Sequence, residues 1–583
     1  MLSALLMLGW LATPTAYAAT MDCPAASSSP NDQITCTINA DQGGAGAQIT
    51  VDFTAPAGTG NNIGSYGGNY TVNNLANLQP ASPQAGLLVR LKGGVGSSDT
   101  SNDATGGGNG GNITITNSGS ISVNTTPTSS SQGNAPGIWD DAGAQFGIYA
   151  ASVGGNGADA NQTSVGGGNG GNGGPASAIT IGNSGTIQVS NLTYGGVGIY
   201  AAGIGGLGGV QDKALSGDQN GGNGGNTSTI GITNSASITV SSSNASRYAW
   251  GIGVESIGGN GGDFNGNGGE PGGVHTSSPS NIANSGAVTV QVNGGSGFAN
   301  GVRGLYIANQ GGDGITSEDG SDNGGAGANA TGLTVTNSAA VTVETSSSLA
   351  APTGLAAISG GIVMIARGGD GGESAQTTSN TSGQRGGVGG SNPYTSTITM
   401  NSGSAITTSG DYLPGVVLLS QGGNGGAGRE DADGGDGGYG GIVNISMNGD
   451  ASIATSGVQS HGIAVRSAGG GGGGVQTSSG LVDFTAENAG TGGVGKDVTI
   501  DTGGGTITTW GANSIGMLAQ SMGGFGGGTT SNFEFFGDAG TTAGDGGSPG
   551  SVTVDSLTQV ATNGASAHGI VAQSLGGGGG AAG

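Results

Sequence analysis

Three histidines are the residues best suited to acid-base or metal chemistry in this 583-residue chain: His275, His461 and His568. General base catalysis requires a reacting group within hydrogen-bond reach of the imidazole, and a metal site requires several ligands at a suitable spacing. None of the three lies in such a spacing. His461 and His568 instead share one position of a repeated segment, directly before a glycine. The sequence therefore predicts no catalytic residue and no metal ligand, and we interpret the protein as non-enzymatic.

The run 490–497, Gly-Thr-Gly-Gly-Val-Gly-Lys-Asp, matches a phosphate-binding loop as far as its lysine. Such a loop requires a Ser or Thr after the lysine to hold magnesium, and a helix whose N-terminus faces the phosphate. Here Asp497 follows, and residues 498–500, Val-Thr-Ile, are typical of a strand. Because 138 residues are glycine, such matches arise by chance, and we expect no cofactor.

Carboxylates in the glycine-rich segments raise the question of calcium. Segments 258–264 and 311–315 match parts of a nine-residue calcium-binding repeat, and one insert holds Glu430, Asp431, Asp433 and Asp436. That repeat binds calcium by stacking consecutive nine-residue copies, whereas here the fragments stand alone about one 50-residue unit apart. We interpret these carboxylates as solvated loop residues and keep calcium-dependent folding as an alternative.

The only two cysteines, Cys23 and Cys36, enclose a short loop near the start of the chain. In an exported protein such a pair is most simply a disulfide that pins the start of the fold. Closing a loop of this size contributes roughly 3 kcal/mol on the chain-entropy model. Two thiols with no nearby histidine cannot complete a tetrahedral metal site.

One segment recurs along the chain and is clearest at 147–157, Gly-Ile-Tyr-Ala-Ala-Ser-Val-Gly-Gly-Asn-Gly. The pattern has a degenerate first copy and then returns at spacings of 47 to 61 residues, at Gly86, Gly147, Gly198, Gly251, Gly304, Gly361, Gly415, Gly462, Gly516 and Gly569. A near-constant period indicates a solenoid. Every second residue from Ile148 is aliphatic or small, whereas the alternate positions admit Tyr149, Glu255, Arg466 and Gln573, as expected of a strand with one buried and one wet side.

A second segment places two short β-branched runs around Asn-Ser-Gly or Asn-Ser-Ala, at 113–123, 179–189, 230–240, 282–290 and 333–343. Asn and Gly tolerate the positive φ of a tight corner, and Asn can hydrogen-bond the backbone locally. We predict an all-β parallel β-helix, or β-solenoid, of ~53-residue repeats, with ladders of Ile, Ser and Asn and with looser glycine-rich loops projecting from one edge. Handedness stays open, as does the choice between one rung per repeat, a stack of about 48 Å, and two, about 96 Å.

The net charge is −25, from 10 Lys+Arg against 35 Asp+Glu. A polyanion would be repelled, which excludes nucleic acid as a partner. Glycine without a strict three-residue period excludes collagen.

The chain divides into three parts. Residues 1–18 combine an apolar run with Pro14 and Ala-Tyr-Ala, and so predict a signal peptide, although the absence of Lys and Arg fits equally a longer leader. Residues 19–85 predict an N-terminal cap of irregular strands with the disulfide, which covers the first rung. Residues 86–583 are the repeats, and because they stop inside an insert we expect a fragment truncated at its C-terminus.

The strings Gly-Ile-x-Ala-x-Ser-x-Gly-Gly and Ile-Thr-x-x-Asn-Ser-Gly-x-Ile, with the export signal, resemble the glycine-rich passenger region of bacterial autotransporters over residues 86–583. The resemblance implies a cell-surface or secreted passenger with an adhesive role toward a host or neighbouring cell surface. It also implies attachment to the outer membrane through a C-terminal β-barrel, which is missing from this sequence. Passengers of this family sometimes carry a protease or lipase, so an enzymatic module outside this fragment is the alternative.

Overall fold

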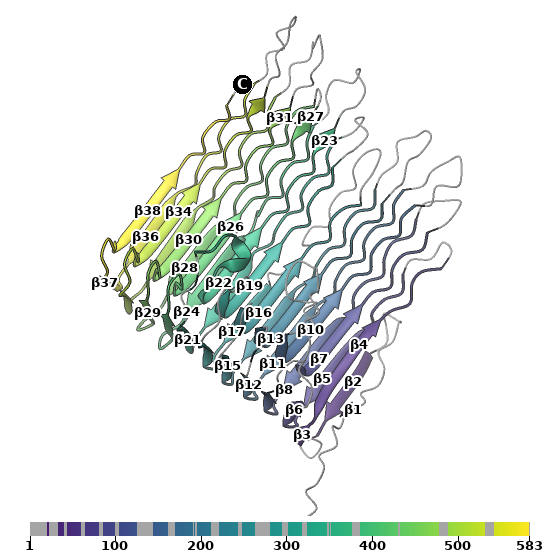
Figure 1. Ribbon diagram of the computed structural model, residues 1–583, viewed down its shortest axis with the longest axis vertical. Coiled ribbons are helices and arrows are strands. Elements are labelled where there is room, and N and C mark those ends of the chain that lie inside the picture. Colours follow the sequence, from purple (N-terminus) through teal and green to yellow (C-terminus); the bar gives the residue numbers. More distant parts are fainter. Residues whose placement is uncertain are drawn as a thin grey trace, which may run out of the picture.

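The computed structural model is an all-β chain in which each strand pairs in parallel with the equivalent strand of the next repeat (Figure 1). The prediction of a parallel β-helix is confirmed. The structure describes residues 20–21, 33–39, 44–59, 64–80, 85–98, 104–124, 144–160, 169–190, 192, 195–210, 221–242, 248–262, 280–293, 301–316, 323–346, 349, 351–375, 385–429, 432–476, 488–530 and 542–581.

Three long sheets, which we name A, B and C, run the length of the stack. Sheet A contains, in order, β1 (Thr20–Met21), β4 (Gln48–Thr54), β7 (Ala85–Lys92), β10 (Gln145–Val153), β13 (Gly195–Ile204), β16 (Tyr248–Ile257), β19 (Val302–Gln310), β22 (Gly360–Arg367), β26 (Val416–Gln421), β30 (Ile463–Ala468), β34 (Met517–Met522) and β38 (Ile570–Leu575). Sheet B contains β2 (Gln33–Ile38), β5 (Asn69–Asn74), β8 (Asn112–Asn117), β11 (Ile179–Asn183), β14 (Ile230–Asn234), β17 (Ser280–Asn284), β20 (Leu333–Asn337), β24 (Thr395–Met400), β28 (Ile442–Met447), β32 (Val498–Thr502) and β36 (Val552–Ser556).

Sheet C contains β3 (Gly44–Gly46), β6 (Leu78–Pro80), β9 (Ile121–Val123), β12 (Ile187–Ser190), β15 (Ile238–Ser242), β18 (Val288–Val292), β21 (Ala340–Thr345), β25 (Ala405–Ser409), β29 (Ser452–Ser456), β33 (Thr506–Thr509) and β37 (Gln559–Thr562). A short fourth sheet contains β23 (Ser374–Ala375), β27 (Gly428–Arg429), β31 (Val475–Gln476) and β35 (Thr529–Thr530). The single described helix is the 3₁₀ turn η2 (Leu355–Ala357).

Each repeat makes one coil, which contributes one strand to each long sheet. Ile148 pairs with Ile199, and Ile199 pairs with Ile252, at spacings of one repeat. This register settles the question that the sequence left open in favour of one rung per repeat. The 11 strands of sheet B give a stack of about 48 Å at the usual ~4.8 Å strand separation.

The interior between the three sheets is a continuous column of aliphatic side chains. Ile148, Ile199 and Ile252 are fully buried and belong to one cluster, so the predicted dry column is confirmed. Burial of one such side chain contributes roughly 1.5–3 kcal/mol relative to exposure. The alternation of buried and exposed residues in β8 shows how the period-2 pattern points its isoleucines inward.

The outer face of sheet A differs from the expectation of a wet surface. Tyr149 and Glu255, at positions interpreted as solvent-facing, are only 4% and 7% exposed. A second apolar cluster covers this face and includes Phe146, Tyr200 and Trp250. The period-2 pattern cannot distinguish a wet face from one that other segments cover. In later coils the expected alternation is present, as in β30, where Ala464 and Arg466 are partly exposed between buried neighbours.

Residues 19–85 also differ from the expectation of an irregular cap. Strands β1, β2, β4, β5 and β7 pair in parallel with the strands of the following coils, so regular coils are present before Gly86. Sequence similarity to the later repeats is weak here, but the alternation of buried and exposed residues in β5 is the same. Cys36 is disulfide-bonded. Cys23 and residues 1–18, the predicted signal peptide, lie outside the described residues.

The glycine-rich segments are ordered layers where the structure describes them, which corrects the prediction of looser loops. We call the segment after each sheet A strand outgoing, and the segment before the next sheet B strand return. A zigzag of N–H···O=C bonds of 2.7 to 2.9 Å joins the two layers, through Gly155, Gly174, Gly206, Gly225 and Gly259 in turn. In Figure 1 these segments continue past the sheet A strands as evenly spaced undulating traces.

Glycine is required in these layers because the two backbones lie too close for a side chain. A Cβ added to Gly206 would lie 2.0 Å from the carbonyl oxygen of Gly155. A Cβ added to Gly225 would lie equally close to the carbonyl oxygen of Gly174. The high glycine content therefore reflects packing of backbone on backbone, not flexibility.

The corner Asn-Ser-Gly also works differently from the expectation. Positive φ does not occur at Asn117 or Gly119, and is found instead at glycines such as Gly403 and Gly449 in later coils. Asn117 donates from Nδ2 to the carbonyl oxygen of Gly119, so the predicted local hydrogen bond is confirmed. A Cβ on Gly119 would lie 1.8 Å from the carbonyl oxygen of Ala76, which explains the small residue.

We expect Gly206→Ala to destabilise the protein by at least about 2 kcal/mol, because the new methyl collides with backbone that cannot move independently. Gly231→Ala is the matched control, since its Cβ meets only the side chain of Asn281 at 3.6 Å. The control should be neutral or more stable by about 0.4–1 kcal/mol, because alanine restricts the unfolded chain. Urea unfolding followed by circular dichroism measures both, and equal midpoints for the two variants would refute the close-packed layers.

Candidate functional site

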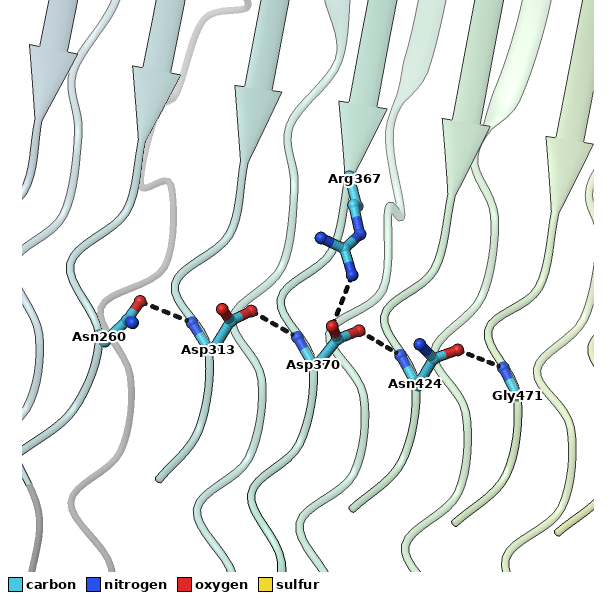
Figure 2. Close-up of polar contacts among 6 residues, drawn as sticks. All are labelled: Asn260, Asp313, Arg367, Asp370, Asn424 and Gly471. Atoms are coloured by element: carbon cyan, nitrogen blue, oxygen red, sulfur yellow. Dashed lines mark hydrogen bonds and ion pairs between the residues drawn. The ribbon is translucent and has the colours of Figure 1, made fainter. Parts of the chain in front are cut away.

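A column of Asn and Asp side chains follows the outgoing layer from coil to coil (Figure 2). Asn260 Oδ1 accepts the backbone N–H of Asp313 at 3.0 Å, and Asp313 Oδ1 accepts that of Asp370 at 2.9 Å. Asp370 in turn accepts from Asn424 at 2.8 Å, and Asn424 from Gly471 at 2.9 Å. Only the acceptor oxygen is used in each step, so Asn and Asp are equivalent here.

These contacts complete a three-residue pattern of hydrogen bonds in the outgoing layer. In the triad 154–156, the N–H of Gly154 bonds to the carbonyl oxygen of Ile204, the last residue of β13 in the next coil. The N–H of Gly155 bonds across to Gly108 of the return layer. At the third position, Asn156 Oδ1 accepts the N–H of Leu207 at 3.1 Å. The backbone N–H groups of Gly154, Gly155 and Leu207 therefore each have a hydrogen-bond acceptor, as buried or crowded backbone requires.

Asp313 and Asp370 lie in adjacent coils, and the charge of Arg367 acts on both carboxylates. Arg367 Nη2 pairs with Asp370 Oδ2 at 2.5 Å. Burial raises the pKa of the Asp313 carboxyl, and the charge of Asp370 acts in the same direction. The backbone N–H of Asp370 and the charge of Arg367 oppose that rise without cancelling it. The carboxylates of Asp313 and Asp370 thus accept hydrogen bonds from backbone N–H groups of the outgoing layer.

The acidic residues considered for calcium serve the same purpose where they are described. Asp433 accepts the N–H of Asn488 at 2.6 Å, and Asp436 accepts that of Thr491 at 2.8 Å. Asp263, Glu430 and Asp431 lie outside the described residues. Within the described ranges no three metal-ligating side chains gather in one place.

A second, buried Asn column closes the C-terminal ends of the sheet B strands. Asn117, Asn183 and Asn234 each donate from Nδ2 to Oδ1 of the next Asn, at 2.7 to 2.8 Å. Here both the donor and the acceptor are used, which requires the amide. The column continues to Asn337 and ends where Met400 takes the next position.

The charged groups of the outer face of sheet A form the most unusual cluster in the described structure. Glu255 accepts a hydrogen bond from the hydroxyl of Tyr200. Arg303 is 1% exposed, and its Nε and Nη2 donate to the carbonyl oxygens of Ile358 and Ala356 at 2.7 and 2.5 Å. Its guanidinium also lies over the ring of Tyr306, 3.8 Å from the centroid, in a cation–π contact.

Burial dominates the electrostatics of this cluster. Desolvation raises the pKa of Tyr200 well above its usual value, and the charge of Glu255 raises it further. Desolvation raises the pKa of Tyr306 in the same way, and it lowers the pKa of Arg303. Both tyrosines therefore stay protonated as hydrogen-bond donors at neutral pH. Carboxylate and guanidinium are compensated by hydroxyls, carbonyl oxygens and rings, as buried charges must be.

A cavity of about 280 Å³ adjoins this cluster, between the outer face of sheet A and the segment containing η2. Its lining includes the charged and amide side chains of Glu255, Arg303, Gln310 and Arg367. The period-2 pattern places Glu255 on a wet face and does not single out Arg303. The available signal was a charged side chain at an outer-facing strand position in two consecutive repeats.

His461 and the stretch before Lys496 take part in hydrogen bonds between segments of the coils. His461 Nδ1 accepts the backbone N–H of Ile515 at 2.9 Å, and burial lowers its pKa. His275 lies outside the described residues. The stretch before Lys496 belongs to the return layer and leads into strand β32, as its sequence predicts.

Comparison with protein family models, with curated proteins and with solved structures finds no match to this chain. Among the described residues, no helix has the length and apolar character needed to cross a membrane. The function must therefore be argued from the sequence pattern and from the geometry above.

The two Asn columns predict opposite responses to the same substitution. Asn234→Asp removes donors to Asn284 Oδ1 and Ala236 O and buries a carboxylate against acceptors, so we expect a loss of at least about 2–3 kcal/mol. Asn156→Asp keeps the acceptor for Leu207 and is exposed, so we expect a change within about 0.5 kcal/mol.

Thermal unfolding of the two variants at neutral pH tests this pair. Similar melting temperatures for both would contradict the assignment of a two-way amide ladder inside and an acceptor-only ladder outside. Lowering the pH should partly restore Asn234→Asp, since a protonated carboxyl regains one donor.

Proposed function

We propose that the chain is the exported, non-enzymatic part of an adhesive cell-surface protein of the autotransporter passenger type. The support is of two kinds: the Gly-Ile-x-Ala-x-Ser-x-Gly-Gly and Asn-Ser-Gly repeats with the apolar leader, and a geometry that repeats one surface many times. The partners would be host or neighbouring cells, and the location the cell surface or the medium.

The observation that carries the proposal is the outer face of sheet B. From β8 to β28 no outward-facing position of this sheet is charged, although the chain as a whole carries −25. Small polar side chains stand in register there, at Thr114, Thr116, Thr180, Thr233, Asn281, Thr334, Thr336, Thr397, Thr399, Asn444 and Ser446. We name this surface the polar face.

Repetition suits a weak, multivalent contact. Each coil offers nearly the same groups one strand spacing from the last, so many weak contacts to a repeating partner add without new geometry. The absence of charge on this face also avoids the repulsion that the negative net charge would cause at an anionic cell surface. Nucleic acid remains disfavoured on the same electrostatic grounds.

An enzymatic module outside this fragment is the alternative, since passengers of the autotransporter type sometimes carry a protease or lipase beside the repeats. In that case the coils would serve to hold the module away from the membrane. A hydrolase assay on the longest natural product distinguishes the two, because activity abolished by substitution of a single nucleophile would support the alternative.

Adhesion is tested with beads coated with the purified chain, scored for binding to epithelial cells and to bacteria. Thr114→Glu, Thr233→Glu and Thr334→Glu together place three charges on the polar face in non-adjacent coils. We expect at least a tenfold loss of bound beads, because each charge must be desolvated or repelled in the contact.

The matched control is Ser122→Glu, Thr239→Glu and Thr342→Glu, which adds the same charge to the outer positions of sheet C. It should retain most of the binding. Wild-type beads that bind no better than uncoated ones would refute the adhesive function, and equal losses in both variants would refute the role of the polar face.

A further inference from the structure

The cavity on the outer face of sheet A brings positive charge beside an apolar hollow. Two of the ten Lys+Arg residues of the chain, Arg303 and Arg367, line it. Apolar lining comes from Ile257, Ala308 and Ile365 on three consecutive coils, and from Leu355 of η2.

Arg367 is the basic group with donors to offer. Its side chain is 24% exposed, and its Nη2 pairs with Asp370. A guanidinium carries five N–H donors in a planar fork, so this ion pair leaves capacity for a second acceptor. Gln310, half-buried and also in the lining, adds an amide that can donate or accept.

The other charges of the cavity are held by the protein itself. Arg303 donates to two backbone carbonyl oxygens and stacks on Tyr306. Glu255 accepts from Tyr200 and is balanced by the nearby Arg303 charge. Neither is exposed enough to approach a ligand as closely as Arg367. Glu255 and Arg303 therefore form a fixed polar wall of the cavity. Its opening presents the guanidinium of Arg367, the amide of Gln310 and aliphatic side chains.

We propose that this cavity binds a small organic carboxylate, with the anionic group held by Arg367 and Gln310 and an apolar body lying against Ile257, Ala308, Leu355 and Ile365. Bidentate hydrogen bonding suits the planar carboxylate to a guanidinium fork. The volume of about 280 Å³ is just below the range of about 300–1,000 Å³ for drug-sized ligands, and so fits a body of one ring. The proposal is independent of the adhesive function and survives or fails separately from it.

Ligand-observed NMR titration of the full chain with phenylacetate tests the proposal, with neutral phenylacetamide as the matched probe. We expect saturable binding of phenylacetate with a dissociation constant on the order of 1 mM, and at least tenfold weaker binding of phenylacetamide. Arg367→Gln should lose at least tenfold in affinity for phenylacetate.

Arg385→Gln is the matched control, because Arg385 also pairs with an aspartate, Asp436, at 2.5 Å but lies outside the cavity. It should bind phenylacetate as the wild type does. Ala308→Met, which fills the cavity without removing a charge, should also abolish binding and decides the matter if Arg367→Gln fails to fold. Absence of saturable binding to the wild type, equal affinity for both probes, or unchanged binding by Ala308→Met would overturn the proposal.

Discussion

Hydrogen bonding between successive coils at one fixed spacing is the constraint on which the rest of this structure depends. A coil of about 53 residues cannot satisfy its own backbone, because its strands meet no strand of the same coil and only its outgoing and return segments bond to each other. Every segment must therefore match the equivalent segment of the next coil. This matching places Ile148 next to Ile199 in sheet A. It also lets the N–H of Gly154 bond to the carbonyl oxygen of Ile204. Stability is then shared among neighbouring coils, as in other solenoids.

The chain meets this constraint in two ways. In the three sheets, alternate side chains point inward and pack into the column around Ile252, while the backbone bonds only along the stack. In the glycine layers, the backbone bonds both along the stack and across to the other layer, so no room remains for a side chain at Gly206. The third residue of each triad points outward, and its Asn or Asp oxygen satisfies the N–H of the next coil.

Sequence reasoning succeeds where the local segment alone determines the structure of a residue and whether it is buried. The period-2 pattern from Ile148 predicts the strand and its buried face, and the corner asparagines such as Asn117 are predicted to hydrogen-bond locally. It fails where a second surface intervenes. Nothing within a single repeat shows that Tyr200 and Glu255 are covered, because the covering residues come from other coils. An asparagine after two glycines, as at Asn156, indicates the hydrogen-bonded outgoing layer. The high glycine content of the same segment, taken alone, suggests a flexible loop.

Hydrogen–deuterium exchange of the glycine layers measures this account most directly. Backbone amides in 154–160 bond to neighbouring coils as those of β13 and β16 do. In 221–229 the amides of Gly222 and Gly225 bond to the outgoing segment of their own coil, and that of Asn223 bonds to Asn172. The account predicts that peptides from both glycine segments exchange as slowly as peptides from the two strands. Complete exchange of the glycine segments within seconds, beside protected strands, would show that they are ordinary loops and would contradict the two-layer packing.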